Sequence, residues 1–488
     1  MHKTSIRIAL LLALIPASSV FAAESIWYKQ NDPLNTEIEL PPAVGASTDN
    51  YSACTASDYQ DLLTLSDVAE AALCNNPQTR EAYANAKVQA AQLGVAKSAY
   101  LPTLTDNVGA NQNYSNPASV TRGSSYNTLS NSIVASYLLY DFGNRDATLE
   151  NARQLLQAAS ATQNSTVQAV LLAAVKAYYQ TQSAIAALSA TLEAERAAEE
   201  SFKSADAKYK AGVSTPADKL QAQTAFAQAT LTRITAEGTL RTAYGTLANV
   251  MGLNANRVVR LVPSNNQLAT QDIGQDIDSL ITLAQQRRPD LLASEAQVRA
   301  AQASIDASKA AAKPTVSLST SNNYQDGTNF TSNNTSSLGV TVSIPLFGGY
   351  SPTYKIRSAE AAAEVKAAQR DSLRLQISLD VWTAYQSLRT ANESIKSAEA
   401  LVASAKESSR VAIGRYKAGV GNIIDTLNAQ SSLASANQQK IQAMLNWDIA
   451  RASLAQSIGA LDNAMIQSLP EASSQVDSQS VDSSKVQP

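Results

Sequence analysis

Side chains that usually carry catalysis or bind metals are scarce in this chain of 488 residues. It has one histidine, His2, and two cysteines, Cys54 and Cys74. His2 lies in an N-terminal segment that is expected to be removed on export, so the mature chain has no imidazole for general-base or metal chemistry. The cysteines are spaced too widely for a Cys-x-x-Cys redox pair. We therefore predict that the protein is not an enzyme and binds no cofactor or catalytic metal.

Residues 1–23 have the pattern of a secretory signal peptide. Two basic residues, Lys3 and Arg7, precede an apolar run that ends near Ile15, and small residues follow it to Ala23. Without these two of the 38 basic residues, 36 remain against 41 acidic ones, a net charge of −5. A charge so near balance does not indicate a nucleic-acid partner.

Export also bears on the cysteines, because disulfide bonds persist outside the cytoplasm. We predict a structural bridge between Cys54 and Cys74 that ties the N-terminal segment to the first helix. Closing a loop of this size stabilises a fold by about 3 kcal/mol.

After the signal, no segment offers the roughly 20 consecutive apolar residues that a membrane-spanning helix needs. An exported chain without such a helix is either soluble or inserted in an outer membrane through β-strands.

The two halves of the sequence form a tandem repeat. The pentapeptide YKAGV occupies Tyr209–Val213 and recurs at Tyr416–Val420. Gly212 and Gly419 suit the end of a helix, because glycine takes the left-handed closing conformation without cost. Four more positions agree downstream: Asp218, Leu220, Ala222 and Gln223 recur as Asp425, Leu427, Ala429 and Gln430.

A new helix is expected to start after each turn. Thr215 and Asn422 are residues typical of N-caps, and Pro216 suits the first helical position. Asp218 and Asp425 follow three residues after the caps, where a carboxylate meets free N–H groups and the positive end of the helix dipole. Each copy of the pentapeptide therefore predicts a tight helix–turn–helix tip.

Long helices are expected on both sides of each tip. No Gly or Pro interrupts residues 144–211, and at 1.5 Å per residue a helix of this span is on the order of 100 Å long. The other predicted helices are 65–73, 77–100 and 216–250 in the first half, and 277–287, 289–312, 351–418 and the segment from the second tip to 458 in the second half.

Between the second and third helices of each half, apolar and polar residues alternate with the period of a β-strand. The alternation is clearest from Val316 to Thr320 and from Leu338 to Leu346. Each half is therefore expected to contain one β-hairpin, at 102–142 and 314–348.

These patterns divide the chain into a series of segments. They are a signal peptide at 1–23, an extended arm at 24–63, a first repeat at 64–253, a linker at 254–280, a second repeat at 281–460, and a C-terminal end at 461–488 whose tail is expected to be disordered.

Four strands cannot close a barrel, and open strand edges are not tolerated in lipid. Closure by several copies would solve both problems, and three copies would supply twelve strands, an even number typical of outer-membrane barrels. In the alternative, each hairpin packs on helices within a soluble monomer. That arrangement needs a large apolar helix face, whereas these helices are rich in Ala, Ser and Gln.

The order of these motifs resembles that of the TolC-type outer-membrane channels over residues 60–460. The resemblance depends on motifs that occur once in each half. They are the breaks Asn76-Pro77 and Arg288-Pro289, the hairpin starts Leu101-Pro102 and Lys313-Pro314, the hairpin ends Asp141–Gly143 and Leu346–Gly348, and the two YKAGV tips.

The resemblance implies an α+β membrane protein that assembles as a homotrimer. A twelve-stranded β-barrel would lie in the outer membrane of a Gram-negative bacterium, joined to a barrel of twelve helices in the periplasm. The segments after 24 and 460, with 254–280, would form an equatorial belt. The implied partners are outer-membrane lipid, a periplasmic adaptor protein and, through it, an inner-membrane transporter.

The resemblance also implies sites at the tips. Asp425 matches an acidic ring that constricts the pore, Asn428 occupies the next ring position, and Asp218 is the equivalent of Asp425 in the first half. In the alternative, both acids only cap their helices. Relatives tie the gate shut with a basic residue on the second tip, and neither Gly421 nor Asn422 is basic.

Gly212, Val213, Gly419 and Val420 are the implied docking surface for the adaptor, or else simply turn residues. The implied function is a passive gated duct for efflux of small toxic molecules. Two alternatives stay open: the exit duct of a type I protein secretion system, and an exported coiled-coil structural protein. The alternating strands argue against the last.

Overall fold

The structure is a computed structural model that describes residues 32–40, 62–115, 124–257, 259–262, 276–328 and 330–461. The predicted signal peptide and C-terminal tail lie outside these residues, as does most of the predicted arm. Cys54 also lies outside them, so its predicted bridge to Cys74 stays a prediction.

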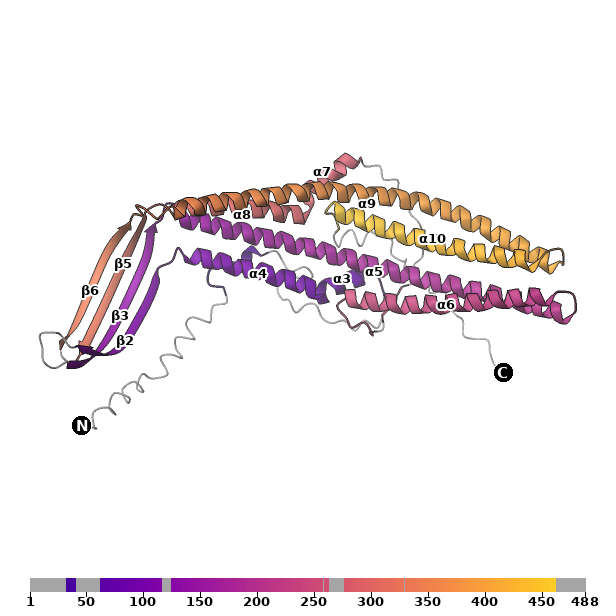
Figure 1. Cartoon of the computed structure of the whole chain (residues 1–488), viewed down its shortest axis with the longest axis horizontal. Helices are drawn as coiled ribbons and strands as arrows, with labels where there is room; N and C mark the ends of the chain where they lie inside the picture. The colour runs from indigo at the N-terminus through magenta and orange to yellow at the C-terminus, as the bar shows by residue number, and fades with distance from the viewer. Residues whose placement is uncertain are drawn as a thin grey trace, which may run out of the picture. The chain divides into compact units, whose positions relative to one another are not determined.

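The two halves of the chain fold into the same series of elements (Figure 1). The first half contains α3 (Leu65–Asn75), α4 (Pro77–Ser98), β2 (Thr103–Ser115), β3 (Ser124–Tyr140), α5 (Asn144–Lys210) and α6 (Pro216–Val250). The second contains α7 (Ile277–Arg287), α8 (Pro289–Ala310), β5 (Thr315–Gly327), β6 (Phe330–Ser343), α9 (Ser351–Lys417) and α10 (Ile423–Ser457). Corresponding helices have equal lengths of 11, 22, 67 and 35 residues.

The predicted helices are confirmed to within a few residues, and local hydrogen bonds explain where they begin. At the start of α3, the Asp67 amide donates to the Thr64 hydroxyl, and the Asp67 carboxylate accepts from the Thr64 amide at 2.8 Å. This reciprocal pair is a capping box. At the break before α4, the Asn76 side chain accepts from the Gln78 amide at 2.9 Å.

The four long strands form one antiparallel sheet in the order β2-β3-β5-β6. The two predicted hairpins are therefore joined through β3 and β5, where Ala135 lies opposite Thr320. In this sheet β2 and β6 each have a neighbour on one side only, so both edges carry unpaired backbone groups.

The strands extend further into polar sequence than the alternation predicts. The stretch 115–128 reads as a loop, yet β3 begins at Ser124, and β6 begins at Phe330 rather than near Leu338. Backbone ladders do not require apolar side chains, and polar pairs across the strands support them. Asn322, for example, donates to Asn334 and to Ser336 at 3.0 and 2.9 Å.

The chain also divides into two compact units that do not follow the sequence repeats, because each unit takes segments from both halves. The first unit combines Asn85–Gln157 with Ala296–Lys366 and contains the sheet. Its helices pack through a small cluster that includes Leu93 and Leu156. Across this packing, the Asn151 side chain donates to the Ala300 carbonyl at 2.7 Å.

The second unit contains the larger core, which packs α3 against α5, α6 and the end of α10. Its fully buried members include Val68, Leu247 and Met251. A short parallel pair, β1 (Leu62–Leu63) with β4 (Arg260–Leu261), borders this core.

Two glycines in the second unit make unusually close backbone contacts. Gly252, after α6, has φ +74°, and a Cβ there would lie 2.5 Å from the carbonyl oxygen of Asn75. Gly459, after α10, has φ +70°, and its Cβ would lie 3.0 Å from the carbonyl carbon of Arg287. The end of α6 thus rests on the end of α3, and the end of α10 rests in the same way on the end of α7.

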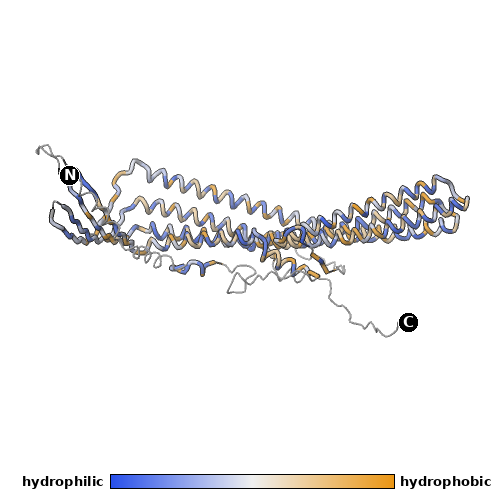
Figure 2. The backbone as a smooth tube through the Cα atoms, turned by 90° about the horizontal axis from the view of Figure 1, so that it is seen from below, coloured by the Kyte–Doolittle hydropathy of each residue, from blue (hydrophilic) through white to orange (hydrophobic). Residues whose placement is uncertain are grey.

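Hydropathy along the helices alternates at short intervals (Figure 2). Among the described residues, no helix has an apolar stretch long enough to cross a membrane.

Candidate functional site

Two tight turns join the long helices, one at α5–α6 and one at α9–α10. At the first tip, Gly212 has φ +74°, and the Val213 amide donates to the Lys208 carbonyl at 3.0 Å. The second tip repeats this geometry, with Gly419 at φ +77° and a bond of 3.0 Å from the Val420 amide. Both are Schellman endings, and the predicted helix–turn–helix tips are confirmed.

The second tip has no room for a side chain at Gly421. A Cβ there would lie 2.9 Å from the Cβ of Arg415 and 2.9 Å from the amide nitrogen of Tyr416. The sequence lacks a basic residue at this position, and the packing of the last turn of α9 gives the physical reason.

The first tip is closed by its own ion pairs. The Asp206 carboxylate lies 2.7 Å from the Lys210 ammonium and 2.8 Å from that of Lys219, so it joins α5 to α6. Hydrogen bonds from these two lysines lower the pKa of Asp206. At the second tip, by contrast, neither Arg415 nor Lys417 forms an ion pair with any residue that the structure describes.

The two helical hairpins pack against each other near their tips. Ala205 and Ala222 of the first hairpin form a buried cluster with Tyr416 and Ile423 of the second. Further along, Gln430 of α10 accepts from the Ser201 hydroxyl of α5 at 3.1 Å. The small alanine side chains allow close approach, and the tyrosine and isoleucine fill the space.

Lys208 makes a short polar contact between these hairpins. Its ammonium donates to the Tyr416 carbonyl at 2.6 Å and lies 3.8 Å from the centre of the Tyr416 ring. The Tyr416 hydroxyl is buried and has no hydrogen-bond partner among the described residues. Burial, and then the nearby Asp218 carboxylate, raise the pKa of Tyr416. The basic residue that holds the second tip therefore comes from the first hairpin.

The two predicted pore acids have different surroundings. The Asp218 carboxylate accepts from the Thr215 amide at 3.1 Å, which completes a capping box at the start of α6. At α10 the cap is Asn422, whose side chain accepts from the Ile424 amide at 2.7 Å. That bond does not involve Asp425, whose exposed carboxylate makes no hydrogen bond or ion pair with the described residues.

Asn428 is also exposed, one turn beyond Asp425 on the same face of α10. The cap role is thus confirmed for Asp218, and its part in a constriction stays a prediction. For Asp425 and Asn428, the pore role stays a prediction. Neither side chain forms a hydrogen bond with the described residues that would hold it away from a pore.

The predicted docking residues lie at the ends of the hairpins and are open to solvent. The side chains of Val213 and Val420 are 72% and 69% exposed. Nothing lies within 4 Å of a Cβ placed on Gly212 or Gly419.

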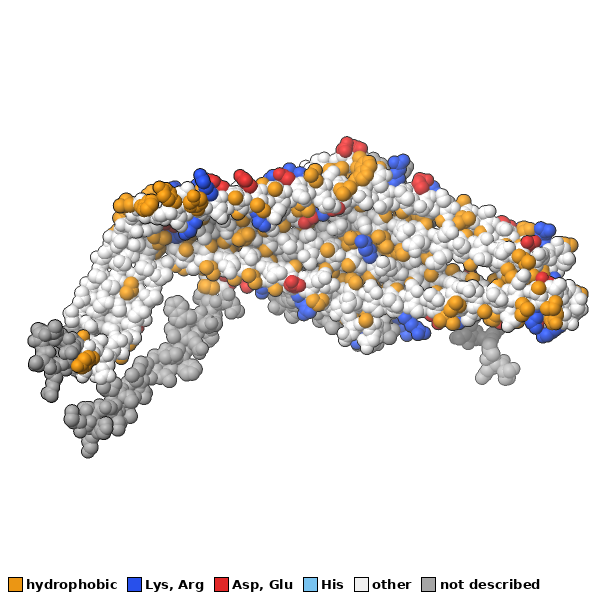
Figure 3. Space-filling view, in the orientation of Figure 1, with side chains coloured by type: hydrophobic (Ala, Val, Ile, Leu, Met, Phe, Trp, Pro, Cys, Tyr) orange, Lys and Arg blue, Asp and Glu red, His pale blue; other side chains and the backbone are white. Residues whose placement is uncertain are grey.

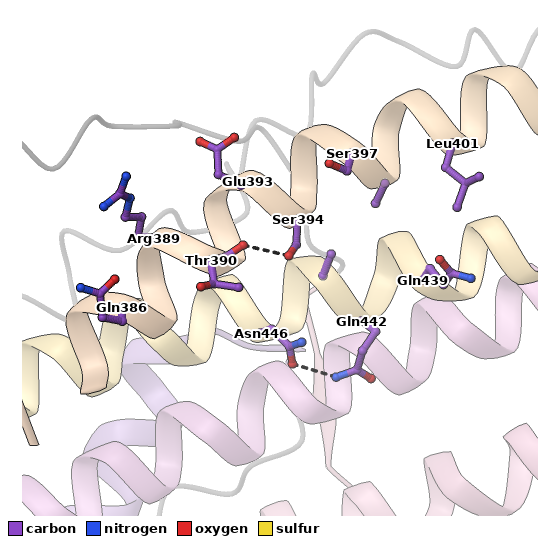
Figure 4. Close-up of a pocket in the computed structure, with 12 residues that line it drawn as sticks. Gln386, Arg389, Thr390, Glu393, Ser394, Ser397, Leu401, Gln439, Gln442 and Asn446 are labelled. Atoms are coloured by element: carbon purple, nitrogen blue, oxygen red, sulfur yellow. Dashed lines mark hydrogen bonds between the residues drawn. The ribbon is translucent and has the colours of Figure 1, made fainter. Parts of the chain in front are cut away.

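A groove of about 690 Å³ runs between α9 and α10 (Figure 4). Most of the residues that line it are polar or charged, among them Arg389, Glu393 and Gln439, but carbon atoms form most of its exposed surface. Within it, Gln442 donates to Asn446 at 2.9 Å. The groove is open to solvent and not enclosed, which favours contact with another protein surface over binding of a small molecule.

Among the residues that the structure describes, nothing covers an apolar row that runs along β6 and one residue beyond it. Leu338, Val340, Val342 and Ile344 are 75%, 61%, 57% and 58% exposed. Apolar side chains also gather around the end of β6 and the start of α9 (Figure 3), where Phe347 and the following tyrosines are exposed.

The family described as "Outer membrane efflux protein" matches residues 68–253 and 280–460, which is most of the chain. The chain belongs to the outer membrane efflux protein family.

This outer membrane efflux protein is similar to several characterised relatives. It is 29% identical over 412 residues to protein CyaE of Bordetella pertussis, covering 83% of this chain and 86% of that one. It is 23% identical over 438 residues to the outer membrane protein TolC of Escherichia coli, covering 87% and 86%. The solved outer-membrane channel OprN superposes with a TM-score of 0.73 at 21% identity, covering 85% of this chain and 96% of that one.

Family membership and this fold confirm several predictions. The protein is a channel of the outer membrane of a Gram-negative bacterium, it serves tripartite efflux or secretion, and it is not an enzyme. Its protomer has the predicted combination of long helices and two β-hairpins.

Sequence reasoning missed two functional candidates in this outer membrane efflux protein. Lys208 was not singled out because its partner, Tyr416, is 208 residues away. The second is Asp448 of α10, where burial raises the carboxyl pKa to about 7. Nothing in the helical pattern around Asp448 distinguishes it from a solvent-facing acid.

Asp448 should make the stability of this outer membrane efflux protein depend on pH. Its folded-state pKa lies above the unfolded value of 3.8, so the folded protein holds the proton more tightly and loses stability as pH rises from about 4 to 7. The loss accumulates at no more than about 1.4 kcal/mol per pH unit. Asp448→Asn should therefore raise the thermal midpoint more at pH 8 than at pH 5. An equal effect at both pH values would contradict a raised pKa.

Proposed function

We propose that three copies of this chain form the outer-membrane exit duct of a tripartite efflux system for small toxic molecules. The observation that carries the trimer is the sheet, whose two edges and apolar face have no partner among the described residues. A sheet with open edges is not tolerated in lipid, and joining β2 of one copy to β6 of the next removes every edge. Three copies give a barrel of twelve strands, with the apolar face toward lipid.

We further propose that a periplasmic adaptor docks on Gly212, Val213, Gly419 and Val420, and that it connects the duct to an inner-membrane transporter. The exposure of both valines and the open space around both glycines support this surface. The polar groove between α9 and α10 would extend the contact along the second hairpin.

The trimer can be tested by electrophoresis of detergent-extracted protein, with and without heating. An unheated sample should migrate as a trimer, and heating should release the monomer. Migration as a monomer at every detergent concentration that retains folded protein would contradict the trimer.

The cargo requires a second experiment, in which the gene is deleted and restored. Deletion should increase sensitivity to several unrelated toxic compounds by several-fold, and should leave the set of secreted proteins unchanged. Loss of one secreted protein with unchanged drug sensitivity would instead support the type I secretion duct.

We propose that Asp425 and Asn428 line the constriction of the pore. Asp425→Ala should raise single-channel conductance and weaken block by divalent or trivalent cations, because a ring of three carboxylates would attract cations to a narrow axis. Asp371→Ala, on the exposed surface of α9, is the matched control and should change neither value. Unchanged conductance and block in Asp425→Ala would exclude the pore role.

A further inference from the structure

A cavity between α5 and α10 is separate from the tips and from the groove of Figure 4. It has a volume of about 210 Å³. Its apolar walls are formed by Ile185 and Ala186 of α5 and by Ile441, Met444 and Leu445 of α10. The polar side chains Gln182, Ser183 and Ser189 of α5 also line it. The carboxylate of Asp448 lies among these side chains, in the stretch where α5 and α10 run side by side (Figure 1).

The Asp448 carboxylate has no counter-charge in contact with it. It forms no hydrogen bond or ion pair with the residues that the structure describes. The charge of Arg451, one turn further along α10, lowers the pKa of Asp448 against the larger effect of burial. Its guanidinium lies 5.1 Å from the centre of the Trp447 ring and forms no ion pair with Asp448. A carboxylate partly removed from water without a partner is costly, so a bound cation would stabilise it.

The chemistry of the cavity limits what it can hold. An anion would be repelled by Asp448, and a divalent metal ion lacks ligands, since no cluster of three suitable side chains occurs in the described parts of the chain. The volume is below the roughly 300 Å³ at which cavities for drug-sized ligands begin. A small molecule with one positive charge and an apolar body matches both the charge and the walls.

We propose that this cavity binds a small organic ammonium ion. The ammonium group would meet the Asp448 carboxylate and the Tyr179 hydroxyl, and the apolar body would lie against Ile185, Ile441 and Leu445. A ligand about the size of an arylalkylamine would suit the cavity. The site would give the helical part of the channel a binding function in addition to conduction.

Binding of an ammonium ion should depend on the ionisation of Asp448, whereas binding of a neutral molecule should not. The titratable and charged groups facing Asp448 are Tyr179 from α5 and Arg451 from α10. With a carboxyl pKa of about 7, the ionised form is the minor one at pH 6 and the major one at pH 8. Only the ionised form pairs with an ammonium ion, so the affinity should rise about tenfold between these pH values.

The test is calorimetric titration of the full-length, detergent-extracted protein with phenethylammonium at pH 6 and pH 8. We expect binding about tenfold tighter at pH 8, and a loss of at least tenfold at pH 8 in Asp448→Asn. A second variant, Ala186→Leu, keeps the carboxylate but fills the cavity, and it should also lose binding. Asp371→Asn removes an exposed carboxylate of α9 and should bind as the wild type does.

Three results would overturn the proposal. They are affinity that does not change between pH 6 and pH 8, wild-type affinity in Asp448→Asn, and binding of neutral 2-phenylethanol as tight as that of the amine. Folding of each variant is checked first by its migration as an unheated trimer, so that a lost binding signal is not due to unfolding.

Discussion

Replacing Gly252 by alanine is expected to prevent accumulation of folded protein. A Cβ at this position would lie 2.5 Å from the carbonyl oxygen of Asn75 and 2.6 Å from its carbonyl carbon. Both contacts are with backbone, so no side chain can rotate away, and α3 would have to separate from the end of α6. The loss of packing around Met251 and Leu247 should cost several kcal/mol, about what a large core truncation costs.

Gly212 provides the matched control, because it has the same φ of +74° but nothing within 4 Å of its Cβ position. Gly212→Ala should therefore cost only the conformational penalty, about 1 kcal/mol. Thermal unfolding and the yield of unheated trimer measure both variants. Equal yields for the two would show that contact with α3 does not require a glycine at position 252.

Removing the Lys208 ammonium is expected to have the largest effect on gating. Lys208→Met keeps the length of the side chain but loses the charge-assisted hydrogen bond to the Tyr416 carbonyl and the contact with its ring. Together these are worth about 2–3 kcal/mol, so the equilibrium between packed and separated hairpins should shift by roughly 30- to 150-fold. We expect a higher open fraction in single-channel recordings and greater sensitivity to large hydrophilic antibiotics.

Lys210 is the control for Lys208, since its ammonium pairs with Asp206 within the first hairpin and does not contact the second. Lys210→Met should leave the open fraction near the wild-type value. Lys208→Arg keeps the positive charge and should recover part of the closure. If Lys208→Met and Lys210→Met had the same open fraction in single-channel recordings, the contact between Lys208 and Tyr416 would have no role in gating.

The sequence predicted local structure well where Gly, Pro and capping residues mark the ends of elements. Pro216, Gly212 and Thr64 fix helix ends through bonds within a few residues, so the spacing of these residues is enough to place α3, α5 and α6. The strands were underestimated because hydrogen-bonded ladders continue through Ser- and Asn-rich sequence such as the start of β6. In that stretch the partner strand, rather than the residue type, decides the structure.

Contacts between distant segments were the part that the sequence could not supply. Periodicity shows the repeats, but the two compact units cut across them, because each is built from packing between the halves. For the same reason, the sequence did not indicate Lys208 or Asp448. Lys208 contacts Tyr416 of the other hairpin, and Asp448 lies in the cavity between α5 and α10. The acidic residue after each tip was recognised, yet only the cap geometry shows that Asp218 is engaged while Asp425 is not.

The equal lengths of α5 and α9 restrict how this protein can change during evolution. Helix α5 makes specific contacts near both of its ends through Asn151 and Lys208. In α9, Lys366 donates to Gln297 of α8, and Tyr416 is buried against the first hairpin. Inserting one residue between those positions would rotate every later side chain by about 100° relative to the earlier ones, so one set of contacts would be lost. Length changes should therefore be accepted only as paired insertions of about seven residues, made in both helices together, which nearly restore the rotational phase.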